Sequence, residues 1–224
     1  MLRLPQIPIL IAALALYVVG LYTALIWAPV ELTLGESYRV FYLHVPVAWV
    51  AYLALGLSLI GSIAYLRTRN TKFDLLAEVT AVLGVLFASL TLVLGSIWAN
   101  VAWGTYWNWD PRETTTLVLW ISYAGYLALR SSIENVIKRA VIPAIYNIFA
   151  FSTVPLSYIS VVYWQTLHPT IISGGKLMIT PEMVATLMIN LVAATFLFIF
   201  LAGFLYRLRR SERILEEYEE LTWR

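Results

Sequence analysis

The fold is decided by long apolar runs such as residues 75–98, LLAEVTAVLGVLFASLTLVLGSIW, in which Glu78 is the one charged side chain. A helix needs about 20 apolar residues to cross the hydrocarbon core of a bilayer, and this stretch is long enough. Five further runs follow the same pattern, at 7–28, 47–66, 114–129, 141–163 and 183–206. We therefore predict an all-α membrane protein with six transmembrane helices in one bundle.

The composition agrees with this class of protein. The chain has 224 residues, of which 61% are hydrophobic and 12% are charged, whereas a soluble domain carries roughly 25% charged residues. The net charge of +2 is too small to indicate a nucleic-acid partner. We predict one transmembrane domain at residues 1–207 and a charged cytoplasmic tail at 208–224.

The basic residues predict the orientation in the membrane. Twelve of the fifteen lysines and arginines fall in the termini and in the loops on one side of the predicted bundle. Arg39, Arg112 and Lys176 are the three on the other side. Because cytoplasmic loops carry an excess of Lys and Arg, we predict that both termini are cytoplasmic. The loops at 29–46, 99–113 and 164–182 are then on the outer side.

Each outer loop carries an unusual polar or aromatic feature. The only two histidines are His44, at the start of the second span, and His168, after the fifth. The loop between the third and fourth spans reads WGTYWNWDPR at residues 103–112. Tryptophan and tyrosine also concentrate at bilayer surfaces without binding anything. Four tryptophans in one outer segment are more than such interfacial anchoring requires. They stand at positions 98, 103, 107 and 109.

The WGTYWNWDPR segment allows a structural and a binding interpretation. Asp110 is a predicted helix N-cap, Pro111 fits the first helical position and Glu113 completes a capping box. At helical spacing, Trp103, Trp107 and Asp110 would lie on one face and form an apolar platform with an acidic edge. Such a platform suits a large planar ligand, and we keep both interpretations.

Two imidazoles are good ligands for haem iron. Because both histidines lie on one side, the chain can hold at most one haem between them. The propionates of haem require cations, and arginine pairs with carboxylates through two parallel hydrogen bonds. Arg39 and Arg112 are therefore the better candidates among the outer cations. With no cysteine and two histidines, the chain offers almost nothing for a zinc site or a hydrolytic triad.

The WGTYWNWDPR segment resembles the tryptophan-rich "WWD" signature of haem-handling proteins in cytochrome c maturation, shared by CcmC, CcmF and CcsA. The chain length and the six-span plan are similar to CcmC. Two further segments are similar to the histidine segments of that family, SYRVFYLHVP at 37–46 and YWQTLH at 163–168. The likeness extends from the first span to the sixth.

This resemblance implies a function and a set of site residues. CcmC-like proteins present haem b at the outer, periplasmic face of the cytoplasmic (inner) membrane to the haem chaperone CcmE. They work beside CcmA, CcmB and CcmD, and they bind haem non-covalently. Carried over by position, His44 and His168 are the axial ligands. The surface that holds the haem edge would be formed by Trp103, Gly104, Trp107, Trp109 and Asp110. The resemblance implies a haem-binding and haem-transfer component and no enzyme.

Two other classes of membrane protein stay open at this point. A b-haem or quinol electron-transfer subunit usually carries its ligating histidines within the spans, often four of them. A haem-translocating transporter subunit would show ionisable residues near the membrane centre. Glu78 lies close to the cytoplasmic end of its run, and we expect it to extend toward the membrane surface. Pro143 and Pro155 are expected to kink the fifth run.

Overall fold

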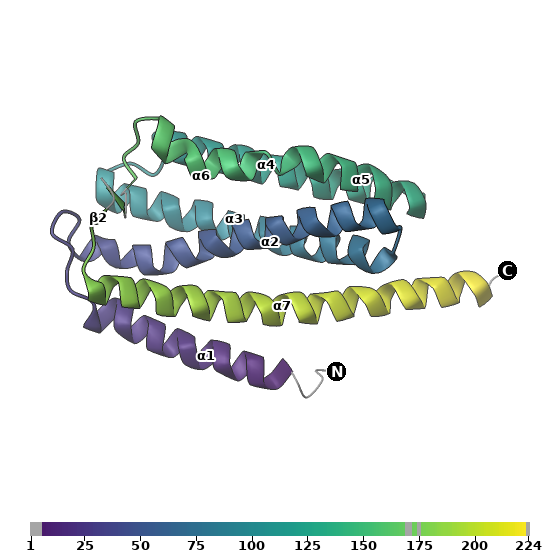
Figure 1. Ribbon diagram of the computed structural model, residues 1–224, viewed down its shortest axis with the longest axis horizontal. Helices are drawn as coiled ribbons and strands as arrows, with labels where there is room; N and C mark the ends of the chain where they lie inside the picture. The colour runs from purple at the N-terminus through teal and green to yellow at the C-terminus, as the bar shows by residue number, and fades with distance from the viewer. Residues whose placement is uncertain (1–5, 169–171, 174–175, 223–224) are drawn as a thin grey trace.

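The computed structural model describes residues 6–168, 172–173 and 176–222, and shows helices running side by side along one long axis (Figure 1). The elements in chain order are α1 (Gln6–Tyr22), a π-turn (Thr23–Trp27), a 3₁₀ turn (Glu36–Val40), α2 (Phe41–Thr68), α3 (Thr71–Trp103), α4 (Pro111–Ser131), α5 (Val136–Ala150), α6 (Thr153–Tyr163), β1 (Ile172–Ser173), β2 (Lys176–Leu177) and α7 (Pro181–Thr222). The protein is thus almost entirely helical, as predicted.

Among the described residues, five helical segments are long and apolar enough to cross a membrane, namely Gln6–Trp27, Glu36–Thr68, Thr71–Trp103, Val136–Tyr163 and Pro181–Glu216. The remaining predicted run, 114–129, forms α4, which has 21 residues but carries Arg112, Glu113 and Arg130 and is less apolar. All six apolar runs therefore fold as helices. The count of six membrane crossings stays a prediction.

Two details differ from a simple six-helix plan. β1 and β2 form a small antiparallel hairpin in which Ile172 pairs with Leu177. The fifth run divides into α5 and α6, which meet at 151–152. Pro155 explains this break, because proline has no N–H and its ring crowds the carbonyl of the residue four positions earlier, here Phe151. Pro143 lies inside α5 without interrupting it.

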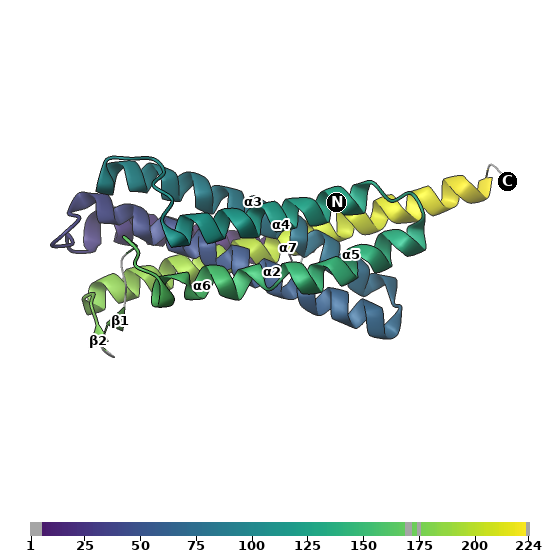
Figure 2. The ribbon, with the colours of Figure 1, turned by 90° about the horizontal axis from the view of Figure 1, so that it is seen from above.

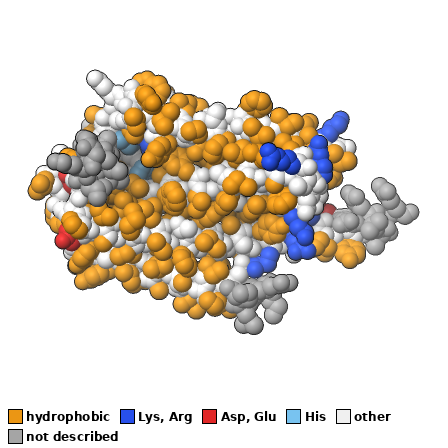
Figure 3. All heavy atoms as spheres, viewed as in Figure 1, with side chains coloured by type: hydrophobic (Ala, Val, Ile, Leu, Met, Phe, Trp, Pro, Cys, Tyr) orange, Lys and Arg blue, Asp and Glu red, His pale blue; other side chains and the backbone are white. Residues whose placement is uncertain are grey.

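The helices pack in pairs around α2 and α3, as two perpendicular views show (Figures 1 and 2). α1 packs on α7, and α4 packs on α3, α5 and α6. The buried core between them contains Leu55, Phe87, Tyr123, Tyr126 and Phe198. Hydrophobic side chains also cover much of the outer surface (Figure 3). An apolar exterior is what a bilayer requires of the helices that contact it.

The bundle has two chemically different ends. His44, near the start of α2, and His168, after the end of α6, line the same cavities at one end of the bundle, which we call the histidine end. Lys and Arg side chains gather at the other end (Figure 3). We call the latter the arginine end. The first and last described residues both lie toward the arginine end (Figure 1). The spatial arrangement therefore agrees with the charge asymmetry of the sequence, although Arg3 and Arg224 lie outside the described residues.

A buried ion-pair cluster closes the arginine end. Arg130 donates hydrogen bonds from Nη1 and Nη2 to Asp74 at 2.7 and 2.8 Å, and from Nη2 to Glu78 at 3.1 Å. Arg213 contacts both carboxylates from α7. Glu78 therefore pairs with two arginines at the arginine end of the bundle, and our expectation that it extends toward the membrane surface stays a prediction.

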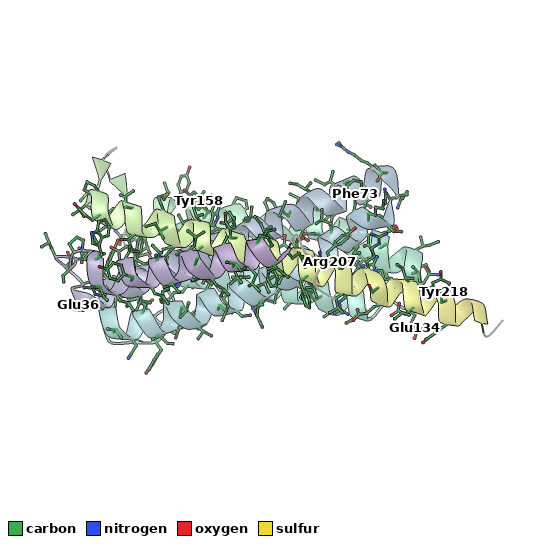
Figure 4. The ribbon with its side chains drawn as sticks, turned by 90° about the horizontal axis from the view of Figure 1, so that it is seen from below. Glu36, Phe73, Glu134, Tyr158, Arg207 and Tyr218 are labelled. Atoms are coloured by element: carbon green, nitrogen blue, oxygen red, sulfur yellow. The ribbon has the colours of Figure 1, made fainter. Side chains whose placement is uncertain are left out.

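α7 continues without interruption into the predicted tail. The helix runs to Thr222 and projects past the other helices at the arginine end (Figures 1 and 2). Figure 4 places Arg207 within the bundle region and Tyr218 on the projecting part. The boundary that we predicted at 207/208 thus falls inside one helix, and Arg213 ties the first turns of the tail to the bundle.

Candidate functional site

The two histidines face shared space at the histidine end. His44 lies in the first turn of α2, and His168 follows the end of α6. Both line two adjoining cavities of about 40 and 220 Å³. The residues common to both cavities are His44, Ala48, Tyr52, Arg112 and His168. The predicted pair of ligands is therefore brought together from two distant parts of the chain.

His44 is held by packing. Its Nδ1 is buried and has no hydrogen-bond partner among the described residues. The ring lies close to α3, where a Cβ added to Gly95 would be 3.0 Å from His44 Cε1. The Trp98 ring, also on α3, lies with its centroid 5.9 Å from that of His44. Glycine at position 95 thus leaves room for the imidazole.

His168 is held by hydrogen bonds to Asp110. Its Nδ1 lies 3.0 Å from Asp110 Oδ1. The Thr166 hydroxyl also donates to Asp110, at 2.8 Å, and accepts the His168 N–H at 3.1 Å. The Leu167 N–H donates to Asp110 at 2.8 Å. One carboxylate therefore fixes the segment 166–168 onto the start of α4.

Asp110 also caps α4, as the sequence predicts. Its carboxylate accepts the Arg112 N–H at 2.8 Å, and Pro111 occupies the first turn. Burial of the carboxyl group raises the pKa of Asp110, but the hydrogen bonds from Leu167, Thr166 and Arg112 lower it by more. The pKa of Asp110 therefore lies below its ordinary value, and the group is a carboxylate at neutral pH.

The environment of His168 favours a neutral ring. Burial is the largest influence and lowers the pKa of His168, while the Asp110 carboxylate raises it without offsetting the burial. The pKa of His168 is therefore below its ordinary value of 6.5. A neutral imidazole with Nδ1–H donated to a carboxylate leaves the Nε2 lone pair free to bind a metal.

The predicted helical platform across Trp103, Trp107 and Asp110 is wrong. α3 ends at Trp103, because Gly104 adopts a left-handed conformation with φ of +76° and closes the helix with a hydrogen bond to Asn100. Residues 104–110 form a loop instead. The Glu113 carboxylate accepts the Asn108 N–H at 3.2 Å, and the backbone N–H of Asp110 also interacts with it, as the predicted capping box requires.

The tryptophans instead form a row of rings between the histidines. Ring centroids are 5.9 Å apart for His44 and Trp98, 6.3 Å for Trp98 and Trp103, and 5.5 Å for Trp103 and His168. Trp98 Nε1 is buried without a partner among the described residues. Trp98 lines the larger cavity, whereas Trp103 lines neither cavity and contacts Trp98 and His168, an arrangement that the helical interpretation did not predict.

The other two tryptophans of the segment have separate positions. Trp107 lines the smaller cavity and a neighbouring apolar groove between α3 and α4. Trp109 packs edge-on against Trp107, with 5.7 Å between centroids, and is 70% exposed. Trp109 also has a φ of +63°, a conformation that costs a bulky residue free energy. Its exposed ring therefore lies at the rim of the site.

The two candidate arginines differ in position. Arg112 lines both cavities and donates to the carbonyls of Ser157 and Tyr158 on α6, at 3.3 and 3.2 Å. Arg39 lines neither cavity and donates to the Ala24 carbonyl at 2.7 Å. The structure thus brings Arg112 to the histidines, whereas Arg39 joins the 3₁₀ turn before α2 to the π-turn after α1. The Lys176 side chain lies outside the described residues.

Several cavity residues were not predicted as site residues. Ala48 and Tyr52 follow His44 at helical spacing, so the periodicity of α2 could have identified them. Tyr158 lines the larger cavity, and its exposed side chain projects from α6 (Figure 4). Thr166 carries no recognisable sequence signal, because its role depends on contact with Asp110, 56 residues earlier.

The chemistry of these residues fits haem better than a bare metal ion. Among the described residues, no group of three or more His, Cys, Asp or Glu side chains could hold a metal ion. Two imidazoles with aromatic neighbours and the unpartnered His44 Nδ1 suit an iron macrocycle. Each cavity is smaller than the roughly 300–1,000 Å³ of enclosed ligand sites. The site therefore suits a ligand that is only partly buried in the protein.

Comparison with known proteins gives a consistent result along the whole chain. The family model described as CcmC, heme exporter protein C, matches residues 3–223. Heme exporter protein C of Bradyrhizobium diazoefficiens is 32% identical over 190 residues, covering 84% of this chain and 72% of that protein. The Haemophilus influenzae protein of the same name is 31% identical over 212 residues, covering 94% and 85%. That of Paracoccus denitrificans is 32% identical over 199 residues, covering 85% and 81%.

Proposed function

The chain belongs to the heme exporter protein C family, and from that premise we propose that it binds haem b non-covalently and presents it to the chaperone CcmE. The observation that carries this proposal is the meeting of His44 and His168 at two shared cavities. Family membership supports haem handling during cytochrome c biogenesis. The shared cavities support these two side chains as the axial ligands.

The surrounding residues supply the remaining parts of a presentation site. Bound haem would supply the iron and a planar, reactive edge. Trp98 and Trp103 form a row of rings between the histidines, and we expect Arg112, which lines both cavities, to pair with a propionate. Trp109 leaves its ring exposed at the rim, where an acceptor protein can contact it. Because the cavities are small, part of the ligand stays accessible for transfer.

We assign the histidine end to the outer, periplasmic face of the cytoplasmic membrane. The concentration of basic side chains at the opposite end supports a cytoplasmic location for that end. The first and last described residues both lie toward the arginine end (Figure 1), which supports an even number of membrane crossings. On this assignment, α4 crosses the membrane as the fourth of six spans in chain order.

The proposed role is handover and not enzymatic turnover. A presenting protein must bind tightly enough to orient its cargo and weakly enough to release it, since uniform tight binding only retains the ligand. We propose the partners that the family implies, which are CcmE as the acceptor together with CcmA, CcmB and CcmD in the membrane. No residue of this chain is assigned a role in forming the covalent bond on the chaperone.

A transfer assay tests this function. The protein is produced with CcmE, and the fraction of chaperone that carries covalently attached haem is measured for wild type, His44→Ala and His168→Ala. A Gln165→Ala variant is the matched control, because Gln165 is exposed and lies three residues from His168. The proposal requires attached haem to fall in both histidine variants and to stay at the wild-type level in the control. Equal attachment in all four proteins would overturn it.

A further inference from the structure

The two histidines differ in what their ring nitrogens contact. His168 Nδ1 lies 3.0 Å from a carboxylate whose side chain is 2% exposed, that of Asp110. His44 Nδ1 is equally removed from solvent but has no partner among the described residues. One imidazole is thus held by a charged acceptor, whereas the other is positioned by contacts with Gly95 and Trp98.

The Asp110 contact fixes which nitrogen of His168 carries the proton. A carboxylate can only accept a hydrogen bond, so the shared hydrogen belongs to His168 Nδ1 and the lone pair to Nε2. A carboxylate behind an imidazole also makes that imidazole a stronger metal ligand, and losing such a partner typically costs 10–100-fold in metal affinity. Among the described residues, no hydrogen-bond acceptor does the same for His44 Nδ1.

Thr166 completes the support of His168. Its hydroxyl lies 2.8 Å from each Asp110 carboxylate oxygen and 3.1 Å from the His168 backbone nitrogen. The backbone N–H of Leu167 adds another hydrogen bond to the same carboxylate. These contacts fix both the backbone at His168 and the carboxylate behind its ring. Thr166 therefore positions His168 and is not itself a ligand.

We propose that the two ligands are unequal. His168, supported by Asp110 and Thr166, is the anchoring ligand, and His44 is the exchangeable one. The inference rests on the proposed function and adds an order of release to it. His44 would be the residue that gives way to a ligand atom of the acceptor at handover. His168 would hold the haem until transfer is complete.

The support of His168 can be tested without haem. In ¹⁵N NMR spectra of the haem-free protein, His44→Ala leaves His168 as the only histidine signal. We expect the Nδ1–H tautomer, its loss in Asp110→Asn and Thr166→Val, and its recovery in Thr166→Ser. Asn135→Ala is the matched control, since it removes the N-cap of α5 at the arginine end. An Nε2–H tautomer, or an unchanged spectrum in Thr166→Val and Asp110→Asn, would overturn the proposal.

The order of release is tested by haem titration of the two histidine variants. We expect His44→Ala to retain five-coordinate haem, and added imidazole to restore a six-coordinate, low-spin spectrum. Since losing the carboxylate support alone typically costs about 10–100-fold in affinity, His168→Ala should bind haem at least that much more weakly, and imidazole should not recover the affinity. If both variants lost the same haem affinity and imidazole restored binding equally in both, the order of release would be overturned and the proposed function would stand. Full binding in both variants would overturn both proposals.

Discussion

Two hydrogen bonds join Arg130 on α4 to Asp74 on α3, from Nη1 to Oδ1 at 2.7 Å and from Nη2 to Oδ2 at 2.8 Å. Both side chains are less than 10% exposed. Removing one partner of a buried ion pair leaves an unpaired charge and costs about 3–5 kcal/mol. We therefore predict that Asp74→Asn lowers the free energy of unfolding in detergent by that amount.

The control for this prediction is the exposed pair between Arg209 and Glu212, whose side chains are 45% and 42% exposed. A pair of this kind contributes only about 0–1 kcal/mol. Glu212→Gln should therefore leave the free energy of unfolding nearly unchanged. Similar losses in Asp74→Asn and Glu212→Gln would contradict a special role for the buried cluster.

Gly95 offers a test of the packing around His44. A methyl group added at this position would lie 3.0 Å from His44 Cε1. Overpacking a well-filled site costs about 1–3 kcal/mol, and relief requires the imidazole to move. We predict that Gly95→Ala weakens haem binding. Gly56→Ala is the matched control, since a methyl group there meets nothing within 4 Å. Equal haem affinity in the two variants would contradict this account of the His44 position.

We expect substitutions of Arg112 and Arg39 to affect different properties, namely haem affinity and stability. Arg112 lines both cavities, whereas Arg39 bonds the Ala24 carbonyl. We predict that Arg112→Gln lowers haem affinity. We predict that Arg39→Gln lowers the free energy of unfolding by about 1.5–3 kcal/mol, the contribution of a hydrogen bond to a charged group, and leaves haem affinity unchanged. Haem titration and denaturant unfolding of both variants measure the two effects. Lower haem affinity only in the Arg39 variant would reverse the assignment.

The membrane topology can be mapped with single cysteines, because the chain has none of its own. Thr33→Cys lies in the first loop of the histidine end, and Ser132→Cys lies between α4 and α5. We expect a membrane-impermeant maleimide applied to whole cells to label the cysteine at 33 and not the one at 132. After cell lysis, both should react. Labelling at 132 in intact cells would contradict the proposed orientation and the crossing by α4.

The helical elements were predictable because the bilayer limits the possible folds. In hydrocarbon every backbone hydrogen bond must be made internally, so each apolar run folds as a helix. The ends of the helices were less predictable. α2 starts at Phe41, ahead of the apolar run at 47–66, and α7 continues to Thr222, far beyond the run that ends at 206. Hydropathy identifies the segment inside the membrane, but capping and local propensity decide where the helix ends.

The site was predictable in its residues but not in its geometry. The family signature identified His44, His168 and Asp110, and the structure places all three at one end of the bundle. The prediction of a helical platform was wrong because helical spacing was assumed to continue past Gly104, whose positive φ ends α3. A glycine after a helical run is a recognised stop signal, and it outweighs periodicity.

Contacts between distant segments could not be predicted from one sequence. Asp110 and His168 are 58 residues apart, and Asp74 and Arg130 are 56 apart. Their pairing depends on how α3, α4 and α6 pack, which local patterns do not encode. The cap role of Asp110 was correctly predicted because it involves the Arg112 N–H, two residues away. Its bond to His168 emerged only from the fold.

The visible absorption spectrum of the purified protein, produced with haem and compared with His44→Ala and His168→Ala, tests the central claim most directly. If the histidines are the axial ligands of one haem, reduced wild-type protein shows the split bands of low-spin, bis-histidine iron. Those low-spin bands should disappear in each variant. Unchanged low-spin spectra in both variants, or a wild-type protein that carries no haem under these conditions, would contradict the account.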